Sequence, residues 1–364
     1  MSDRVDALTG LRFVAALAIV LHHLQGLLWL PADAFEGVAL YQGVTFFYVL
    51  SGFILQHSYS HRLGVAAGGI TPAQFIALRF FRLWPCHIAV LALLTAANHE
   101  WILDYFRQTY SIEQILAAIF LLQAWSTDVK AVFALNGPAW SISAEMFFYA
   151  MFPWLCREAL KSAWRPIYIG AAITVAWLAV VWLYMPDGNL QVLLVTNPLA
   201  RILEFATGVS CYKLFARSER RFRSGTSLEL GALAIAALSL AVIPYVSAVA
   251  SGKTWLLLAL WLGNCASVLA FAMLITIIFR NEGRVSKFAG WGPLAYLGEI
   301  SFALYLVHQP VIFYLARFAP WFRQLPMSTQ VMVFALVVLG LSSALHHLVE
   351  KPCMNISRRL ILGR

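Results

Sequence analysis

Residues 6–30 combine a long apolar run with a few polar side chains that could carry out chemistry. Arg12 stands near the start of this run, and His22 and His23 stand near its end. A helix rises about 1.5 Å per residue, so the step from Arg12 to His23 is roughly 16 Å long. Histidine can remove a proton near neutral pH. The pattern therefore predicts a general base, His23, deep in a membrane and a cation at one membrane face.

A carboxylate also lies within a predicted apolar span. Glu145 belongs to the span at 139–157, and an unpaired carboxylate in such surroundings is costly. It could hold His23 in the right tautomer, bind a substrate, or pair with an intramembrane cation such as Arg201. Arg201 and Glu204 lie three residues apart and could equally neutralise each other. The residues alone leave these alternatives open.

The order of these and further motifs along the chain resembles the bacterial membrane-bound acyltransferase-3 family. The matching stretches are Leu11-Arg12 with His23, and then residues 43–55, 79–85, 140–145, 298–308 and 350–352. Together they cover nearly the whole chain in the same order. The resemblance implies an enzyme that transfers an acyl group, usually acetyl, from coenzyme A to a hydroxyl of a glycan or a similar molecule. It implies acyl-CoA as the donor substrate and requires no metal.

Arg79 and Arg82 are expected to bind the donor together with Arg12. The first two lie three residues apart and so share one face of a helix. Guanidinium groups bind phosphates in a bidentate manner, and coenzyme A carries several phosphates. The alternative is that these arginines only mark the cytoplasmic side of the membrane.

Four residues are expected near the acceptor: Trp140, Ser143, Tyr305 and His308. Trp140 could stack on a sugar or anchor its helix at the membrane interface. Tyr305 and His308 share a helix face, and a position at the interface explains them nearly as well. With Glu145, these residues would orient a hydroxyl whose proton His23 removes. A transient acyl-histidine is an alternative that stays open.

The composition is that of an all-α, polytopic membrane protein with one domain over residues 1–364. The chain is 61% hydrophobic and 12% charged, with a mean hydropathy of +0.75, whereas a soluble domain carries about 25% charged residues. The net charge of +9 is expected to report cytoplasmic loops and not nucleic-acid binding. The five cysteines are scattered, which argues against a disulfide framework and against a zinc site.

Apolar runs predict ten membrane spans. They lie at about 7–29, 41–59, 82–98, 139–157, 165–185, 195–214, 228–248, 254–279, 296–317 and 328–349. With the N-terminus inside, most lysines and arginines then lie on the cytoplasmic side, including the cluster at 217–223, and both termini are cytoplasmic. Counting the short run 111–125 as a further span would export that cluster. We therefore expect 111–125 to form a re-entrant or interfacial helix.

Two other classes of protein compete with a membrane enzyme of the bacterial inner membrane. A transporter that exports a small anion or a glycan precursor would also need intramembrane charges, although no internal repeat is visible. A structural subunit would leave Arg12, His23 and Glu145 without a purpose. The acceptor stays open among O-antigen, exopolysaccharide, peptidoglycan, a lipid-linked sugar and a small secreted metabolite.

Overall fold

A computed structural model describes residues 2–63, 69–97, 99–185, 189–216, 225–248 and 253–363. In this part of the chain the regular elements are helices, and the β-structure is one isolated bridge between Leu63 and Ile70. The α-helices are α1 (Ser2–Leu24), α2 (Gly43–Tyr59), α3 (Pro72–Ala97), α4 (His99–Thr109), α5 (Ile112–Ile119), α6 (Val129–Val132), α7 (Trp140–Lys161), α8 (Arg165–Tyr184), α9 (Leu190–Val195), α10 (Pro198–Cys211), α11 (Thr226–Ala248), α12 (Lys253–Cys265), α13 (Val268–Phe279), α14 (Arg284–Ala289), α15 (Gly292–Glu299), α16 (Ser301–Phe318), α17 (Met327–Leu345) and α18 (Lys351–Leu362).

Seven helical segments in the described residues are long and apolar enough to cross a membrane. The pair α15 and α16, bent by 62° at its junction, makes an eighth if it counts as one span. The chain is therefore a multi-pass membrane protein. Two other predicted spans are not among these segments. Helix α2 has only 17 residues, and α7 carries the charged Glu145 in its first half, which lowers its hydropathy. The count of ten spans and the cytoplasmic termini stay predictions, and the cluster at 217–223 lies outside the described residues.

The stretch 111–125 contains only short helices, and its re-entrant or interfacial position stays a prediction. Its helix α5 has eight residues and so measures about 12 Å, against a hydrocarbon core of about 30 Å. Ser111 and Gln114 cap its start through reciprocal hydrogen bonds. Ile112, Leu116 and Phe120 on this helix are exposed, which suits an interfacial position.

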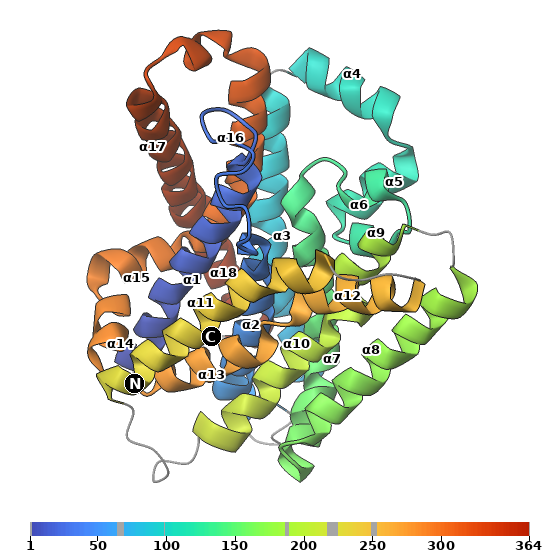
Figure 1. Cartoon of the computed structure of the whole chain (residues 1–364), viewed down its shortest axis with the longest axis vertical. Coiled ribbons are helices and arrows are strands. Elements are labelled where there is room, and N and C mark those ends of the chain that lie inside the picture. The colour runs from blue at the N-terminus through green and yellow to red at the C-terminus, as the bar shows by residue number, and fades with distance from the viewer. Residues whose placement is uncertain are drawn as a thin grey trace.

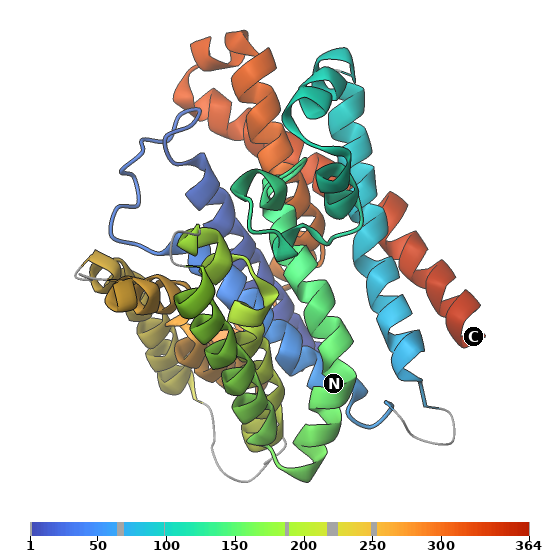
Figure 2. The ribbon, with the colours of Figure 1, turned by 90° about the vertical axis from the view of Figure 1, so that its right-hand side faces the viewer.

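The bundle is built around α2 and α10, which pack closely on each other. Figure 1 shows α11, α12 and α13 at the level of this pair, in the lower half of the view, and α16 and α17 above it. In Figure 2, α1 and α3 run in the same general direction, away from the end of the molecule that holds the N-terminus. Helix α1 packs against α15 and α16, so the candidate base and the late motifs meet.

Helix α3 begins where the sequence predicts. The Thr71 amide donates to Gln74 Oε1 at 2.9 Å, and the Gln74 amide donates to Thr71 Oγ1 at 3.2 Å. This capping box satisfies two backbone donors that the first helical turn leaves free. Because the helix starts at Pro72 and continues to Ala97, Arg79 and Arg82 occupy its first half.

The contact between α2 and α10 depends on glycines. A Cβ atom on Gly208 would lie 2.0 Å from the Val49 carbonyl oxygen, and one on Gly52 would lie 2.1 Å from that of Phe205. Both distances are shorter than any real contact, so only glycine permits this approach of the two backbones. The predicted packing role of Gly52 is confirmed.

We expect Gly208→Ala to lower the thermal stability of the purified protein. The added methyl group must push α2 away from α10, and overpacking of this kind costs about 1–3 kcal/mol. Gly231→Ala is the matched control, because a Cβ there meets no atom within 4 Å. Thermal unfolding in detergent measures both variants, and equal melting temperatures would contradict the close contact.

Candidate active site

A cavity of about 120 Å³ lies among α1, α2, α3, α7 and α16. Its lining includes Arg12, Arg79 and Arg82, together with Glu145 and Tyr305. These residues are far apart in the sequence and come from four different helices. The structure thus brings together all three arginines of the predicted donor site and two further predicted site residues. We call it the arginine-lined cavity.

Arg79 is held rigidly, yet one of its donors has no partner. Its guanidinium carbon lies 4.9 Å from the centre of the Tyr59 ring and 5.9 Å from that of Tyr149, and it donates a hydrogen bond to the Tyr59 hydroxyl. The buried Nε atom has no hydrogen-bond partner among the described residues. A buried donor without a partner is costly, so this arrangement suits an arginine that binds an anion.

Glu145 faces the arginines and not the predicted base. Its Oε1 atom accepts hydrogen bonds from Ser51 Oγ at 2.9 Å and from the Tyr149 hydroxyl at 2.5 Å. Its charge interacts with those of Arg12 and Arg82. No contact joins Glu145 to His23 within the described part. Ser51 is a site residue that the sequence did not indicate, because its partner lies 94 positions away.

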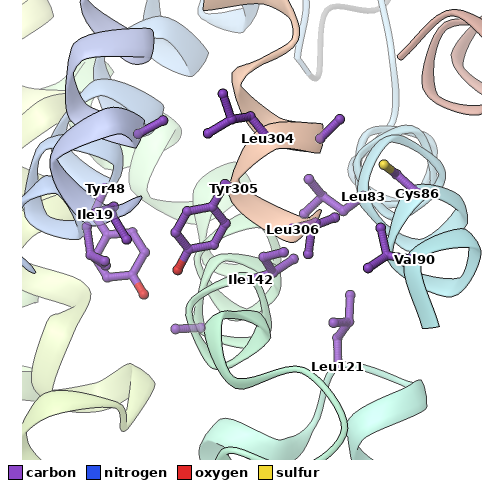
Figure 3. Packing of buried hydrophobic residues seen from close by; sticks show 14 of the residues in the cluster. Ile19, Tyr48, Leu83, Cys86, Val90, Leu121, Ile142, Leu304, Tyr305 and Leu306 are labelled. Carbon is purple, nitrogen blue, oxygen red and sulfur yellow. The ribbon is translucent and has the colours of Figure 1, made fainter. Parts of the chain in front are cut away.

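Tyr305 joins the arginine-lined cavity to the start of α7. Its hydroxyl lies 3.0 Å from the Pro138 carbonyl oxygen and 2.7 Å from Ser141 Oγ. Figure 3 shows its ring near Ile19 and Tyr48, on the side of α16 away from α3. The turn at residues 136–138 that the sequence predicts for the start of α7 is present as a 3-10 helix, Gly137–Ala139.

His23 meets His308 across 285 positions of sequence. The Nδ1 atom of His23 lies 2.9 Å from Nε2 of His308, and the two rings stack with centres 5.1 Å apart. His308 is fully buried, and its Nδ1 lies 3.3 Å from the Leu304 carbonyl oxygen. We call these two residues the histidine pair. On α16, His308 lies about one helical turn beyond Tyr305.

The hydrogen bonds of the histidine pair determine its tautomers. A carbonyl oxygen only accepts, so Nδ1 of His308 must carry its hydrogen and Nε2 of the neutral ring must accept. His23 then donates from Nδ1, which leaves a lone pair on its own Nε2. A buried imidazole without an anionic partner stays neutral, and no carboxylate contacts His308 in the described residues. In this arrangement the lone pair on Nε2 of His23 is free to accept a proton, and the side chain that contacts the His23 ring is His308 and not Glu145.

Three of the four predicted acceptor residues do not line the arginine-lined cavity. Ser143 is buried, and its Oγ accepts a hydrogen bond from the Ala124 amide at 3.2 Å. Trp140 packs against the main hydrophobic core and does not line the arginine-lined cavity. His308 contacts His23 instead of facing that cavity. The acceptor roles of these residues stay predictions without geometric support.

Arg201 pairs with Glu204, as one of the alternatives predicted. Arg201 Nε lies 2.6 Å from Glu204 Oε1, and both side chains are buried. Arg201 also donates from Nη2 to Thr45 Oγ1 at 3.1 Å. The two charges neutralise each other inside the membrane, so Arg201 is not the partner of Glu145.

Comparison with known proteins places these motifs in a family. The family described as "Acyltransferase domain" matches residues 5–347. The acyltransferase MdmB of Streptomyces mycarofaciens is 26% identical over 98% of this chain and 93% of its own length. The transacylase BcsY of Komagataeibacter xylinus, named as membrane-bound, is 24% identical over 85% of this chain and 73% of its own.

A third relative links the comparison to polysaccharides. The exopolysaccharide production protein ExoZ of Rhizobium meliloti is 27% identical over 46% of this chain and 48% of its own length. No solved structure matches this chain.

Proposed function

Because this chain belongs to the membrane-bound acyltransferase-3 family and is thus an O-acyltransferase, we propose that it moves an acyl group from cytoplasmic acyl-CoA to a hydroxyl of a cell-envelope or secreted glycan. Acetyl is the expected acyl group, and the bacterial inner membrane is the expected location. The observation that carries the proposal is the arginine-lined cavity, which extends to Tyr305, one helical turn from the histidine pair. The name of ExoZ, an exopolysaccharide production protein, supports a glycan as the acceptor.

The donor binds with its phosphates against Arg12, Arg79 and Arg82. The unpartnered Nε of Arg79 supports this assignment, because a phosphate oxygen would satisfy it. The cavity of about 120 Å³ is smaller than a typical pocket for a whole small molecule. It suits the slender pantetheine arm, whose thioester would follow the roughly 16 Å from Arg12 to His23.

His23 acts as the general base in the proposed reaction. Its Nε2 removes the proton of the acceptor hydroxyl, and the oxygen forms a bond to the thioester carbon. The carbon–sulfur bond breaks, and coenzyme A leaves as a thiolate that recovers a proton from His23. Glu145 balances part of the positive charge of Arg12 and Arg82, the arginines that bind the donor. A transient acyl-histidine is the alternative route.

We expect His308→Phe to lower kcat by about tenfold or more, less than the 10²–10⁴-fold effect of losing the base itself. Without an acceptor at Nε2 of residue 308, His23 can exchange its tautomer and turn its lone pair away. The apparent KM for acetyl-CoA should stay near the wild-type value, since His308 does not touch the arginines.

His308→Asn provides the matched control for that prediction. Its side-chain carbonyl can still accept the hydrogen from His23 Nδ1, so part of kcat should return. Steady-state kinetics with acetyl-CoA measure both variants. Equal loss in both, or a change in KM for the donor alone, would show that His308 does not orient the base.

A label-transfer experiment tests the function as a whole. Membranes with the chain, and matched membranes without it, receive acetyl-CoA labelled in the acetyl group, and the glycan fraction is counted. An acyltransferase moves the label to glycan only in the first sample. A carrier of anions or glycan precursors would leave the label on coenzyme A, and that result would overturn the proposal.

A further inference from the structure

A second cavity, of about 430 Å³, lies among residues close in sequence to both members of the histidine pair, Leu27 and Gln309. Its lining comes from α4, from the loop before α7 and from α16, and includes Gln309, the residue next to His308. Its volume falls within the range of about 300–1,000 Å³ for small-molecule sites. We propose that this aromatic-lined cavity binds the acceptor and that the acceptor presents an uncharged sugar ring to it. The inference rests on the proposed function and names the substrate class and the place where it binds.

Two amide side chains in this lining have oxygens without partners. Asn136 is buried, and its Nδ2 donates to the Leu306 carbonyl oxygen at 3.0 Å. Its Oδ1 atom accepts no hydrogen bond within the described chain, and the same holds for the buried Oε1 of Gln309. Buried acceptors without donors are costly. A ligand with several hydroxyl groups would satisfy both oxygens.

Aromatic rings form much of the remaining lining. Trp101 and Tyr105 stack with ring centres 5.1 Å apart and planes tilted by only 6°, and Phe106, Tyr110 and Phe133 also line the cavity. Ring faces of this kind pack against apolar surfaces and leave polar edges free. A sugar ring offers the matching shape, because its faces carry C–H groups while its hydroxyls point outward around the edge.

The lining is uncharged, which decides against an anionic or cationic ligand. The residues that line this cavity include no Asp, Glu, Lys, Arg or His side chain. Burial and the neighbouring Tyr105 raise the pKa of Tyr110 to about 12, so this phenol stays neutral at physiological pH. A charged ligand would lose its hydration here without a compensating partner.

Helix α16 contributes to both cavities and to the histidine pair. Tyr305 lines the arginine-lined cavity, His308 contacts His23, and Gln309 lines the second cavity. A hydroxyl bound at Gln309 is therefore close in space to the proposed base. The acceptor and donor would approach the pair from two different cavities.

The test compares two cavity variants with a matched control. Tyr105→Ala and Gln309→Leu alter the lining, and Tyr314→Ala removes a tyrosine of equal exposure (38% against 39% for Tyr105) that does not line the cavity. Each variant replaces the native chain in cells, and mass spectrometry measures the acylated glycan. Binding of radiolabelled acetyl-CoA is measured on the same variants, purified in a detergent without a sugar head group.

We expect Tyr105→Ala and Gln309→Leu to yield about tenfold less acylated glycan with unchanged binding of acetyl-CoA, and Tyr314→Ala to behave like the wild type. Normal glycan acylation in both cavity variants would overturn the inference, and so would a parallel loss of donor binding. An acyl mass found on a compound without a sugar ring would overturn the substrate class. If deletion of the whole chain changes no acyl mass, the proposed function itself fails. This deletion therefore distinguishes failure of the proposed function from failure of the acceptor-cavity inference.

Discussion

His23→Ala should lower kcat for acyl transfer by about 10²–10⁴-fold, the usual cost of losing a general base. Alanine cannot accept the proton of the hydroxyl, so the attacking oxygen stays a weak nucleophile. Binding of acetyl-CoA should persist, because the arginine-lined cavity does not include His23. Turnover of labelled acetyl-CoA and donor binding are measured on the same purified sample.

The control for this variant is His61→Ala, which removes an exposed imidazole that does not line the arginine-lined cavity. It should retain wild-type turnover. Near wild-type activity in His23→Ala would refute the base assignment. Loss of donor binding together with turnover would point to misfolding or to a donor site that extends further than proposed.

Arg82→Met should raise the apparent KM for acetyl-CoA by roughly 10- to 150-fold and change kcat much less. A hydrogen bond to a charged group contributes about 1.5–3 kcal/mol, which corresponds to this range of affinity. Methionine keeps most of the side-chain length and apolar surface, so the packing around the cavity should survive. Steady-state kinetics with varied donor and fixed acceptor give the two constants.

Arg62→Met serves as the comparison, because Arg62 is an exposed arginine outside the cavity. Both substitutions remove one positive charge, so a general electrostatic effect would appear in both. Equal KM values for the two variants would show that Arg82 does not contact the donor. A rise in the KM for the acceptor alone would show that Arg82 binds the acceptor and not the donor.

Local patterns predicted the parts of the fold that depend on neighbouring residues. The capping box at Thr71 and Gln74 determined the start of α3 correctly, and Gly52 indicated a close helix contact. The number of membrane spans is harder to count from hydropathy, because a polar residue such as Glu145 lowers the hydropathy of its own helix. The bend of 62° between α15 and α16 depends on tertiary packing and leaves no simple signal.

The site shows the same division between local and distant information. The resemblance to a family grouped Arg12, Arg79 and Arg82, and the structure places them around one cavity. It could not show that His23 meets His308, since that contact joins the two ends of the chain. Contacts between distant parts of the chain are not visible in the sequence, so Glu145 was a candidate to orient the base. The hydroxyl of Ser143 was expected to contact a substrate, but it accepts a hydrogen bond from the Ala124 amide in a loop.

The contact between His23 and His308 has a consequence for the ion gradients across the membrane. Their rings stack with centres 5.1 Å apart, and neither ring lines the arginine-lined cavity or the second cavity. In the proposed reaction only the small acyl group would have to pass the histidine pair, while both bulky polar reactants stay in their own cavities. Such a transfer needs no open channel through the membrane. If the donor is cytoplasmic and the acceptor external, as proposed, the membrane would keep its ion gradients during every turnover, and the energy for modifying the acceptor would come from the donor thioester alone.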